Sequence, residues 1–297
     1  MSNKKMLLKK DIKEKRELVN IEIDRYLPRK DEYPKQIHKA IRHTLFAGGK
    51  RLRPYLLINT YLLFKNDLDK VLKLAGALEM LHTYTLIHDD LPEIDNDDYR
   101  RGKKACHIVF GSDIALLAGD SLLVYAFAMI ADSEIEEKLK LKVIKELSQE
   151  MGNNGLIAGQ MVDIMSEGKK PSPKTLEYIH YNKTARLINI AIRFGCYFGK
   201  AEKADLDRMK KFGEKIGLAF QIVDDILDVE GNEQTLGKTI GKDKKVQKMT
   251  FPAVYGLEKS KQMATKMIED AKKLLKPYGE KAEILLMLCD FILTRKF

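Results

Sequence analysis

The chain has 297 residues, of which 44% are hydrophobic and 32% are charged, and its formal net charge is +10. The three cysteines (Cys106, Cys196 and Cys289) form no CxxC pair, which argues against a zinc site or a disulfide scaffold and predicts free thiols in a cytoplasmic protein. The lysines and arginines are scattered, so a solvated basic surface or an anion pocket is a better interpretation than a nucleic-acid site.

The hydrophobic pattern is helical almost throughout, without alternating β-branched runs or Asn-Gly hairpin signals. It predicts an all-α, single-domain helical bundle over residues 1–297. The predicted helices cover 4–26, 34–46, 50–65, 68–90, 112–131, 134–151, 155–166, 173–180, 182–199, 203–229, 248–258, 260–276 and 279–295.

Two of these segments, 71–88 and 114–131, are apolar all round, so we expect both in the core of the bundle. The second would nearly span a bilayer. It carries Gly119-Asp120-Ser121 near its centre, which favours a core helix over a membrane span.

The first acidic motif runs from Asp89-Asp90 to Asp95 and contains Pro92. Because proline cannot continue the helical ladder, the helix should end near Asp90, and irregular backbone should return Asp95 towards it. Carboxylates at a helix C-terminus face the negative end of the macrodipole, which is unfavourable without a cation. An acidic loop is the simpler alternative for this motif by itself.

The second acidic motif is Asp224-Asp225-Ile226-Leu227-Asp228. Asp224 and Asp228 are four residues apart and project from one helix face, with Asp225 about 100° away. Like charges at this spacing destabilise a helix, and the flanks are apolar, so a bound cation is a better explanation than a solvated acidic face. Hard carboxylate ligands of this kind suit Mg²⁺ bridged to a polyanion.

Basic residues accompany both motifs. Gly48-Gly49-Lys50-Arg51-Leu52-Arg53-Pro54 precedes an apolar helix, and Lys50 and Arg53 would share a helix face there. A helix N-terminus after glycines offers free N–H groups to a phosphate. Arg100-Arg101 follows the first acidic motif directly, where arginine forks could hold a metal diphosphate.

Together these stretches resemble the short-chain trans-prenyl diphosphate synthases, most closely the bacterial farnesyl diphosphate synthases. The resemblance runs from residue 48 to the C-terminus, and the DDxxxxD and DDxxD motifs with GGKRLRP upstream are highly specific. It is carried by Gly48–Pro54, Leu81–Gly102, Leu117–Asp120, Gly159-Gln160 with Asp163, Lys183-Thr184, Phe220–Asp228, Leu236–Lys238 and Asp290–Lys296.

The resemblance implies an all-α homodimer with one central cavity per subunit and three Mg²⁺ ions per active site. It places the metal at Asp89, Asp90, Asp95, Asp224, Asp225 and Asp228. It assigns the allylic diphosphate to Arg100, Lys183, Lys238 and Lys248, and isopentenyl diphosphate to Lys50, Arg53, His82 and Arg101. Lys183, Thr184 and Gln221 take the catalytic positions near the developing cation.

The implied reaction condenses isopentenyl diphosphate with dimethylallyl and geranyl diphosphate to give farnesyl diphosphate. Tyr84, five residues before Asp89, and its neighbour Thr85 correspond to the family's chain-length positions. A core aromatic without that role is the alternative for Tyr84. A geranylgeranyl or geranyl diphosphate synthase is the alternative product assignment. A class I terpene cyclase, a non-catalytic subunit and a basic RNA-binding helical protein are the remaining alternatives.

Overall fold

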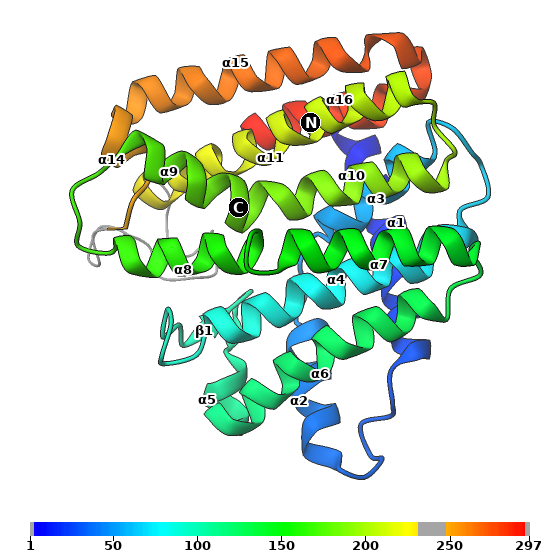
Figure 1. Ribbon diagram of the computed structural model, residues 1–297, viewed down its shortest axis with the longest axis vertical. Coiled ribbons are helices and arrows are strands. Elements are labelled where there is room, and N and C mark those ends of the chain that lie inside the picture. The colour runs from blue at the N-terminus through cyan, green and yellow to red at the C-terminus, as the bar shows by residue number, and fades with distance from the viewer. Residues whose placement is uncertain (1–2, 231–247, 295–297) are drawn as a thin grey trace.

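Long helices lying roughly side by side build the molecule, with the cyan-to-green α4, α6, α7 and α8 in front of the N-terminal helices (Figure 1). The computed structural model describes residues 3–230 and 248–294. The first half contains α1 (Asn3–Tyr26), α2 (Lys35–Leu45), α3 (Leu52–Tyr61), α4 (Asp69–Asp89), α5 (Cys106–Phe110), α6 (Ser112–Ala131), α7 (Glu137–Met151) and α8 (Leu156–Ser166).

The second half contains α9 (Pro173–Ile179), the π-helix η1 (His180–Ala185), α10 (Arg186–Phe198), α11 (Lys203–Glu230), α14 (Phe251–Tyr255), α15 (Leu257–Leu275), the 3₁₀-helix η2 (Lys276–Ala282) and α16 (Glu283–Thr294). In the described residues the one sheet is a two-stranded hairpin of β1 (Tyr99–Arg100) and β2 (Lys103–Lys104). The predicted all-α class is therefore confirmed.

The helix α4 is the central element, as its apolar sequence predicted. It packs against α6, α3 and α1, and Ala77, Leu78 and Leu81 are completely buried. Almost every residue from Val71 to Leu81 is buried, so apolar surface is removed from water on every side of this part of the helix. The cavity described below therefore has one rigid wall.

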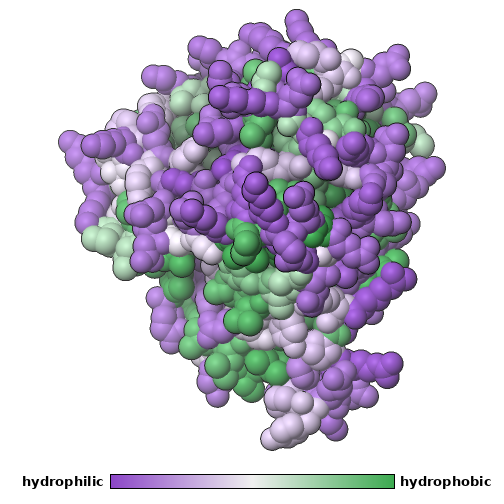
Figure 2. Space-filling view, turned by 45° about the vertical axis from the view of Figure 1, so that its right-hand side comes forward, coloured by the Kyte–Doolittle hydropathy of each residue, from purple (hydrophilic) through white to green (hydrophobic). Residues whose placement is uncertain are grey.

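Helix α6 differs from the prediction that it lies wholly in the core. It has the length and hydropathy of a membrane-crossing helix, but it packs against α4, α2, α5 and α7 along one side. Leu116, Leu117 and Val124 are 46%, 56% and 67% exposed. Figure 2 shows hydrophobic surface gathered over the lower half of the molecule. Sequence hydropathy did not distinguish an outward apolar face from a buried one.

The loop before α3 corrects a second prediction. Arg51 has φ of 52°, so the helix begins only at Leu52 and Lys50 lies outside it. Lys50 and Arg53 therefore do not share a helix face. Pro54 does fall in the first helical turn, where its missing N–H costs nothing.

Two local elements were not predicted. The hairpin turns at Arg101 and Gly102, whose φ angles of 55° and 74° are the backbone of a tight two-residue turn. The π-helix η1 joins α9 to α10 without a break, where the sequence predicted two separate helices. Such π turns insert an extra residue into a helix and are frequent at functional sites.

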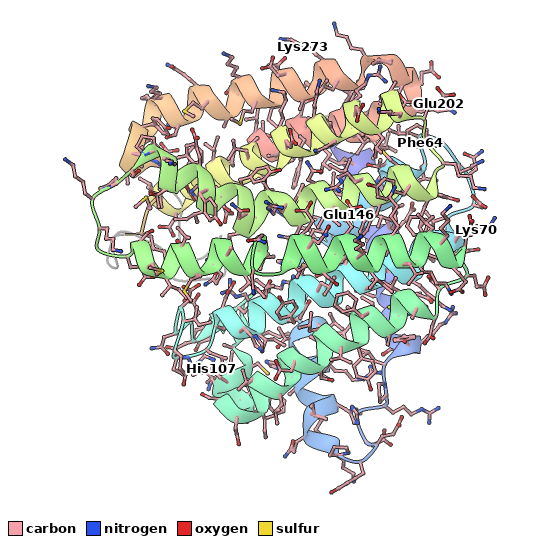
Figure 3. All side chains as sticks on the ribbon, viewed as in Figure 1. Phe64, Lys70, His107, Glu146, Glu202 and Lys273 are labelled. Carbon is pink, nitrogen blue, oxygen red and sulfur yellow. The ribbon has the colours of Figure 1, made fainter. Side chains whose placement is uncertain are left out.

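The C-terminal end of α4, the hairpin and α14 all lie at the same end of the bundle. This end is at the left of Figure 1. Phe64, Lys70 and Glu202 mark the opposite end, where the connecting loops run (Figure 3). The acidic motifs therefore belong to the end that carries the hairpin.

Candidate active site

A cavity of about 660 Å³ opens between α3, α4, α8, η1, α11 and α16. Its charged lining consists of Arg16, Lys50, Arg51, Arg53, Glu79, Asp89, Asp95, Arg100, Arg101, Asp163, Lys183, Asp224, Asp225 and Lys248. His82, Thr85, Thr184 and Gln221 also line it. The fold thus brings most of the predicted site residues, from segments far apart in the chain, to one cavity.

Four predicted site residues are not among those that line it. Asp90 and Asp228 are buried, 1% and 7% exposed. Tyr84 is 6% exposed and packs edge-on against His88 with ring centroids 5.6 Å apart. Lys238 lies outside the described residues.

The first acidic motif has the predicted backbone. Helix α4 ends at Asp89, and the amide of Asp95 donates to the carbonyl of Asp89 at 2.8 Å. Asp90 accepts a hydrogen bond from Arg100 Nε at 2.8 Å. Burial raises the pKa of Asp89, and it raises the pKa of Asp90 to about 6 although Arg100 opposes the shift. The carboxylates at this helix end are therefore short of positive charge.

Two lysines face this motif from other elements. Lys248 Nζ lies 2.8 Å from Asp95 Oδ1, and Lys183 Nζ lies 2.6 Å from Asp163 Oδ2. Burial would raise the pKa of Asp95, but Lys183 and Lys248 outweigh it, so the pKa is lowered. Burial would likewise lower the pKa of Lys183, but Asp89 and Asp163 raise it. Lys183 is therefore a permanent cation inside the cavity.

The second acidic motif is divided between two roles. Asp224 lines the cavity. Asp225 accepts hydrogen bonds from Gln221 Nε2 and from the amide of Phe251, both at 2.8 Å. His180 Nε2 lies 3.3 Å from Asp225, and its ring stacks on Phe251 with centroids 5.2 Å apart. Asp225 thereby fastens the start of α14, next to Lys248, to α11.

The basic end of the cavity is formed by the lining residues Arg16, Arg51, Arg53 and Arg101. Glu79 is 1% exposed and its Oε1 accepts from Arg51 Nη1 at 2.9 Å and from Arg101 Nη2 at 3.2 Å. Arg53 is 9% exposed, and its Nε has no hydrogen-bond partner within the described chain. Burial lowers the pKa of Arg53 to about 10, and burial with the neighbouring arginines lowers the pKa of His82 well below 6.5. His82 is therefore a neutral imidazole beside a cluster of guanidinium groups.

The polyprenyl synthetase family model matches residues 34–285. The chain belongs to the polyprenyl synthetase family.

Its relatives in this family include enzymes with different products. The geranylgeranyl diphosphate synthase of Cyanophora paradoxa is 42% identical over 285 residues, covering 95% of this chain and 94% of that protein. The farnesyl diphosphate synthase of Geobacillus stearothermophilus is 40% identical over 287 residues, covering 96% of each. The chain is therefore a trans-prenyltransferase of the short-chain type, and both product lengths occur among its relatives.

A solved structure of the family has the same fold. The geranyltransferase of Helicobacter pylori, determined with magnesium and isoprenyl diphosphate, matches with a TM-score of 0.84 at 28% identity and covers 99% of this chain and 97% of that one. The all-α prenyl synthase architecture predicted from the sequence is thus confirmed.

The carboxylates of the two acidic motifs fit magnesium, the metal present in that structure. In the part of the chain that the structure describes, no three His, Cys, Asp or Glu side chains gather into a ready metal cluster. Asp89, Asp95 and Asp224 nevertheless line one cavity, and Oδ2 of the buried Asp90 has no hydrogen-bond partner. Mg²⁺ typically takes one or two carboxylates and completes its shell with water and phosphate oxygens. Water and phosphate oxygens would complete the shell of a metal held by so few carboxylates.

Several residues of the site were not in the predicted set, among them Glu79, His180 and Arg16. Glu79 could have been suspected, because it is the one carboxylate in the apolar segment 71–88, where a buried charge needs a partner. His180 carried no signal beyond its place before Lys183. Arg16 lies upstream of every motif, so nothing in its local sequence marked it.

Proposed function

We propose that this prenyltransferase condenses isopentenyl diphosphate with dimethylallyl and then geranyl diphosphate, and releases farnesyl diphosphate. The observation that carries the proposal is the division of one cavity into two charged ends. Asp89, Asp95 and Asp224 form the acidic end, and Arg53 and Arg101 belong to the basic end. A metal-bound allylic diphosphate suits the first, and a diphosphate bound directly by cations suits the second.

The acidic end would hold the allylic substrate through Mg²⁺. When bound, the metal supplies positive charge that neutralises the aspartates and the diphosphate. Lys183 and Lys248 lie beside Asp163 and Asp95 and remain protonated, so they can stabilise the charge that grows on the leaving diphosphate. Such stabilisation accelerates the reaction because it is stronger in the transition state than in the ground state.

The remaining lining suits a short-lived allylic cation. Leu86, Leu156, Leu187 and Phe220 contribute apolar walls that limit the access of water. Thr184 and Gln221 add polar groups without a full charge. After attack by the double bond of isopentenyl diphosphate, the departing diphosphate accepts the proton, so the cycle needs no protein base.

Product length is assigned to Tyr84 and Thr85. Thr85 lines the cavity, and Tyr84 lies next to it, buried, on the same helix. The bulky Tyr84 side chain would limit growth of the chain along α4 beyond C15. The C20 product is the second candidate, because a geranylgeranyl diphosphate synthase matches the chain as well as a farnesyl diphosphate synthase does.

Product analysis tests this proposal. The protein is supplied with Mg²⁺, labelled isopentenyl diphosphate, and a C5, C10 or C15 allylic diphosphate in separate reactions. Use of C5 and C10 with a C15 end product supports the proposal. Efficient use of the C15 substrate would move the assignment to a C20 synthase. No condensation with any acceptor, from folded protein, would favour a non-catalytic subunit.

The exposed apolar face of α6 supports the proposed homodimer. Leu117 and Val124 lie on this face, and Ile108 and Val109 of the neighbouring α5 are 43% and 44% exposed. Contiguous apolar surface of this kind is a common site of association. Light scattering after gel filtration should give the mass of a dimer for the wild type and of a monomer for the double variant Leu117→Glu/Val124→Glu. A monomeric wild type would contradict the proposal.

Cytoplasmic localisation stays a prediction. It is favoured by the three free, buried thiols.

A further inference from the structure

Four guanidinium groups line the basic end of the cavity, and two of them pair with the carboxylate of Glu79. Arg51 and Arg101 are paired with Glu79, whereas Arg16 and Arg53 also line the cavity. Within the described residues, neither Arg16 nor Arg53 has a hydrogen-bond acceptor or an ion-pair partner. Partly buried cations without a counter-charge are costly. This part of the cavity therefore lacks negative charge that a ligand can supply.

Helix α1 fixes Arg16 in this position. Val19 and Ile23 are completely buried and hold one face of the helix against the core. Asn20, one turn after Arg16, accepts a hydrogen bond from Arg51 Nε at 3.0 Å. Residues four apart share a helix face, so Arg16 and Asn20 both face the loop that carries Arg51.

The neighbouring Lys15 has an ion-pair partner on α1, whereas Arg16 has none within the described residues. Lys15 Nζ lies 2.7 Å from Asp11 Oδ1 and 2.6 Å from Asn59 Oδ1. The charge of Arg16 also reaches the basic end: burial lowers the pKa of Arg51, Glu79 opposes this, and Arg101 and Arg16 lower it further. Arg16 is thus electrostatically part of the cluster although it precedes the family-matched residues 34–285.

We infer that Arg16 is an additional diphosphate-binding residue, which contacts the diphosphate of isopentenyl diphosphate together with Arg53 and Arg101. The inference rests on the proposed function for the identity of the ligand. A diphosphate supplies several negative charges and many acceptor oxygens, which match the free donors of Arg16 and Arg53. The guanidinium fork can bind two oxygens at once, so lysine is an incomplete replacement.

Steady-state kinetics with both substrates varied test this inference. Arg16→Gln should raise the KM for isopentenyl diphosphate about tenfold, the loss of one charge-assisted hydrogen bond, and should change the KM for geranyl diphosphate less than about twofold. Arg16→Lys should fall between the wild type and Arg16→Gln. The control Arg25→Gln changes an exposed arginine on the same helix and should match the wild type. An unchanged KM for isopentenyl diphosphate, or an equal rise for both substrates, would overturn the inference.

A binding measurement separates this inference from the proposed function. Isopentenyl diphosphate is titrated without Mg²⁺ into the wild type and Arg16→Gln in a calorimeter. Binding about tenfold weaker in the variant supports the role of Arg16 even if no condensation occurs. Equal affinities overturn it even if the wild type is an active synthase.

Discussion

The guanidinium carbon of Arg101 lies 2.6 Å from the position that a Cβ atom would take at residue 49. Gly49 has φ of +100°, and Arg101 Nη1 donates to the carbonyl of Gly48 at 2.8 Å. The absence of a side chain at Gly49 therefore lets the hairpin arginine reach Glu79 and the loop before α3. Two motifs that are separate in the sequence become one basic site.

Gly49→Ala tests this contact. Its methyl group should displace Arg101 and lower kcat/KM for isopentenyl diphosphate about tenfold, as expected when one charge-assisted contact is lost. Gly48→Ala is the matched control, because Gly48 also has positive φ, +113°, but a Cβ there meets no atom within 4 Å. Both variants should lose about 1–2 kcal/mol of stability from backbone strain. Equal kinetic defects in the two variants would show that strain, and not the Arg101 contact, is responsible.

Glu79→Gln should destabilise the protein and increase the rise in melting temperature that diphosphate produces. Removing one partner of a buried ion pair costs about 3–5 kcal/mol, because Arg51 and Arg101 lose their counter-charge. Diphosphate should then raise the melting temperature more in the variant than in the wild type. The control Glu137→Gln affects a pair in which the acid side chain is 84% exposed, so it should cost at most about 1 kcal/mol. An equal diphosphate response in Glu79→Gln and wild type would argue against Glu79 as the counter-charge of this site.

His82 should make the substrate-free protein less stable in mild acid. Its pKa in the folded protein is lowered by burial and by Arg53 and Arg101, whereas in the unfolded chain it is about 6.5. As the pH falls through that value, only the unfolded state takes up the proton, so the free energy of unfolding falls by up to about 1.4 kcal/mol per pH unit. Denaturant unfolding near neutral pH and about one and a half units lower should show a smaller acid loss in His82→Gln. Parallel losses would contradict a neutral His82.

Tyr84→Ala should let products of C20 or longer appear, because truncating the buried ring next to the lining residue Thr85 would leave room for a longer chain. The variant should also lose about 3–5 kcal/mol of stability, the usual cost of truncating a buried aromatic residue. Chromatography of the dephosphorylated products measures the chain length. Tyr197→Ala, which truncates a partly buried tyrosine beside Phe194 on α10, is the control and should keep the wild-type product. An unchanged C15 product from Tyr84→Ala would contradict its role in chain length.

Local sequence signals predicted the features that depend on neighbouring residues. Helical periodicity predicted the all-α fold, and Pro92 predicted the end of α4 near Asp90. The same reasoning predicted the return of Asp95 to Asp89. Local sequence signals did not predict the π-helix η1 or the positive φ of Arg51, because apolar periodicity indicates neither feature.

The sequence by itself determined the helical fold, the two acidic motifs and the family to which they are similar. Only the tertiary structure decided which side chains meet. Lys248 pairs with Asp95 across 153 residues, Asp225 fastens the start of α14, and Arg16 joins a basic site from a helix outside the motifs. Contacts of this kind depend on how whole helices pack against one another, which the spacing of residues within one segment does not indicate.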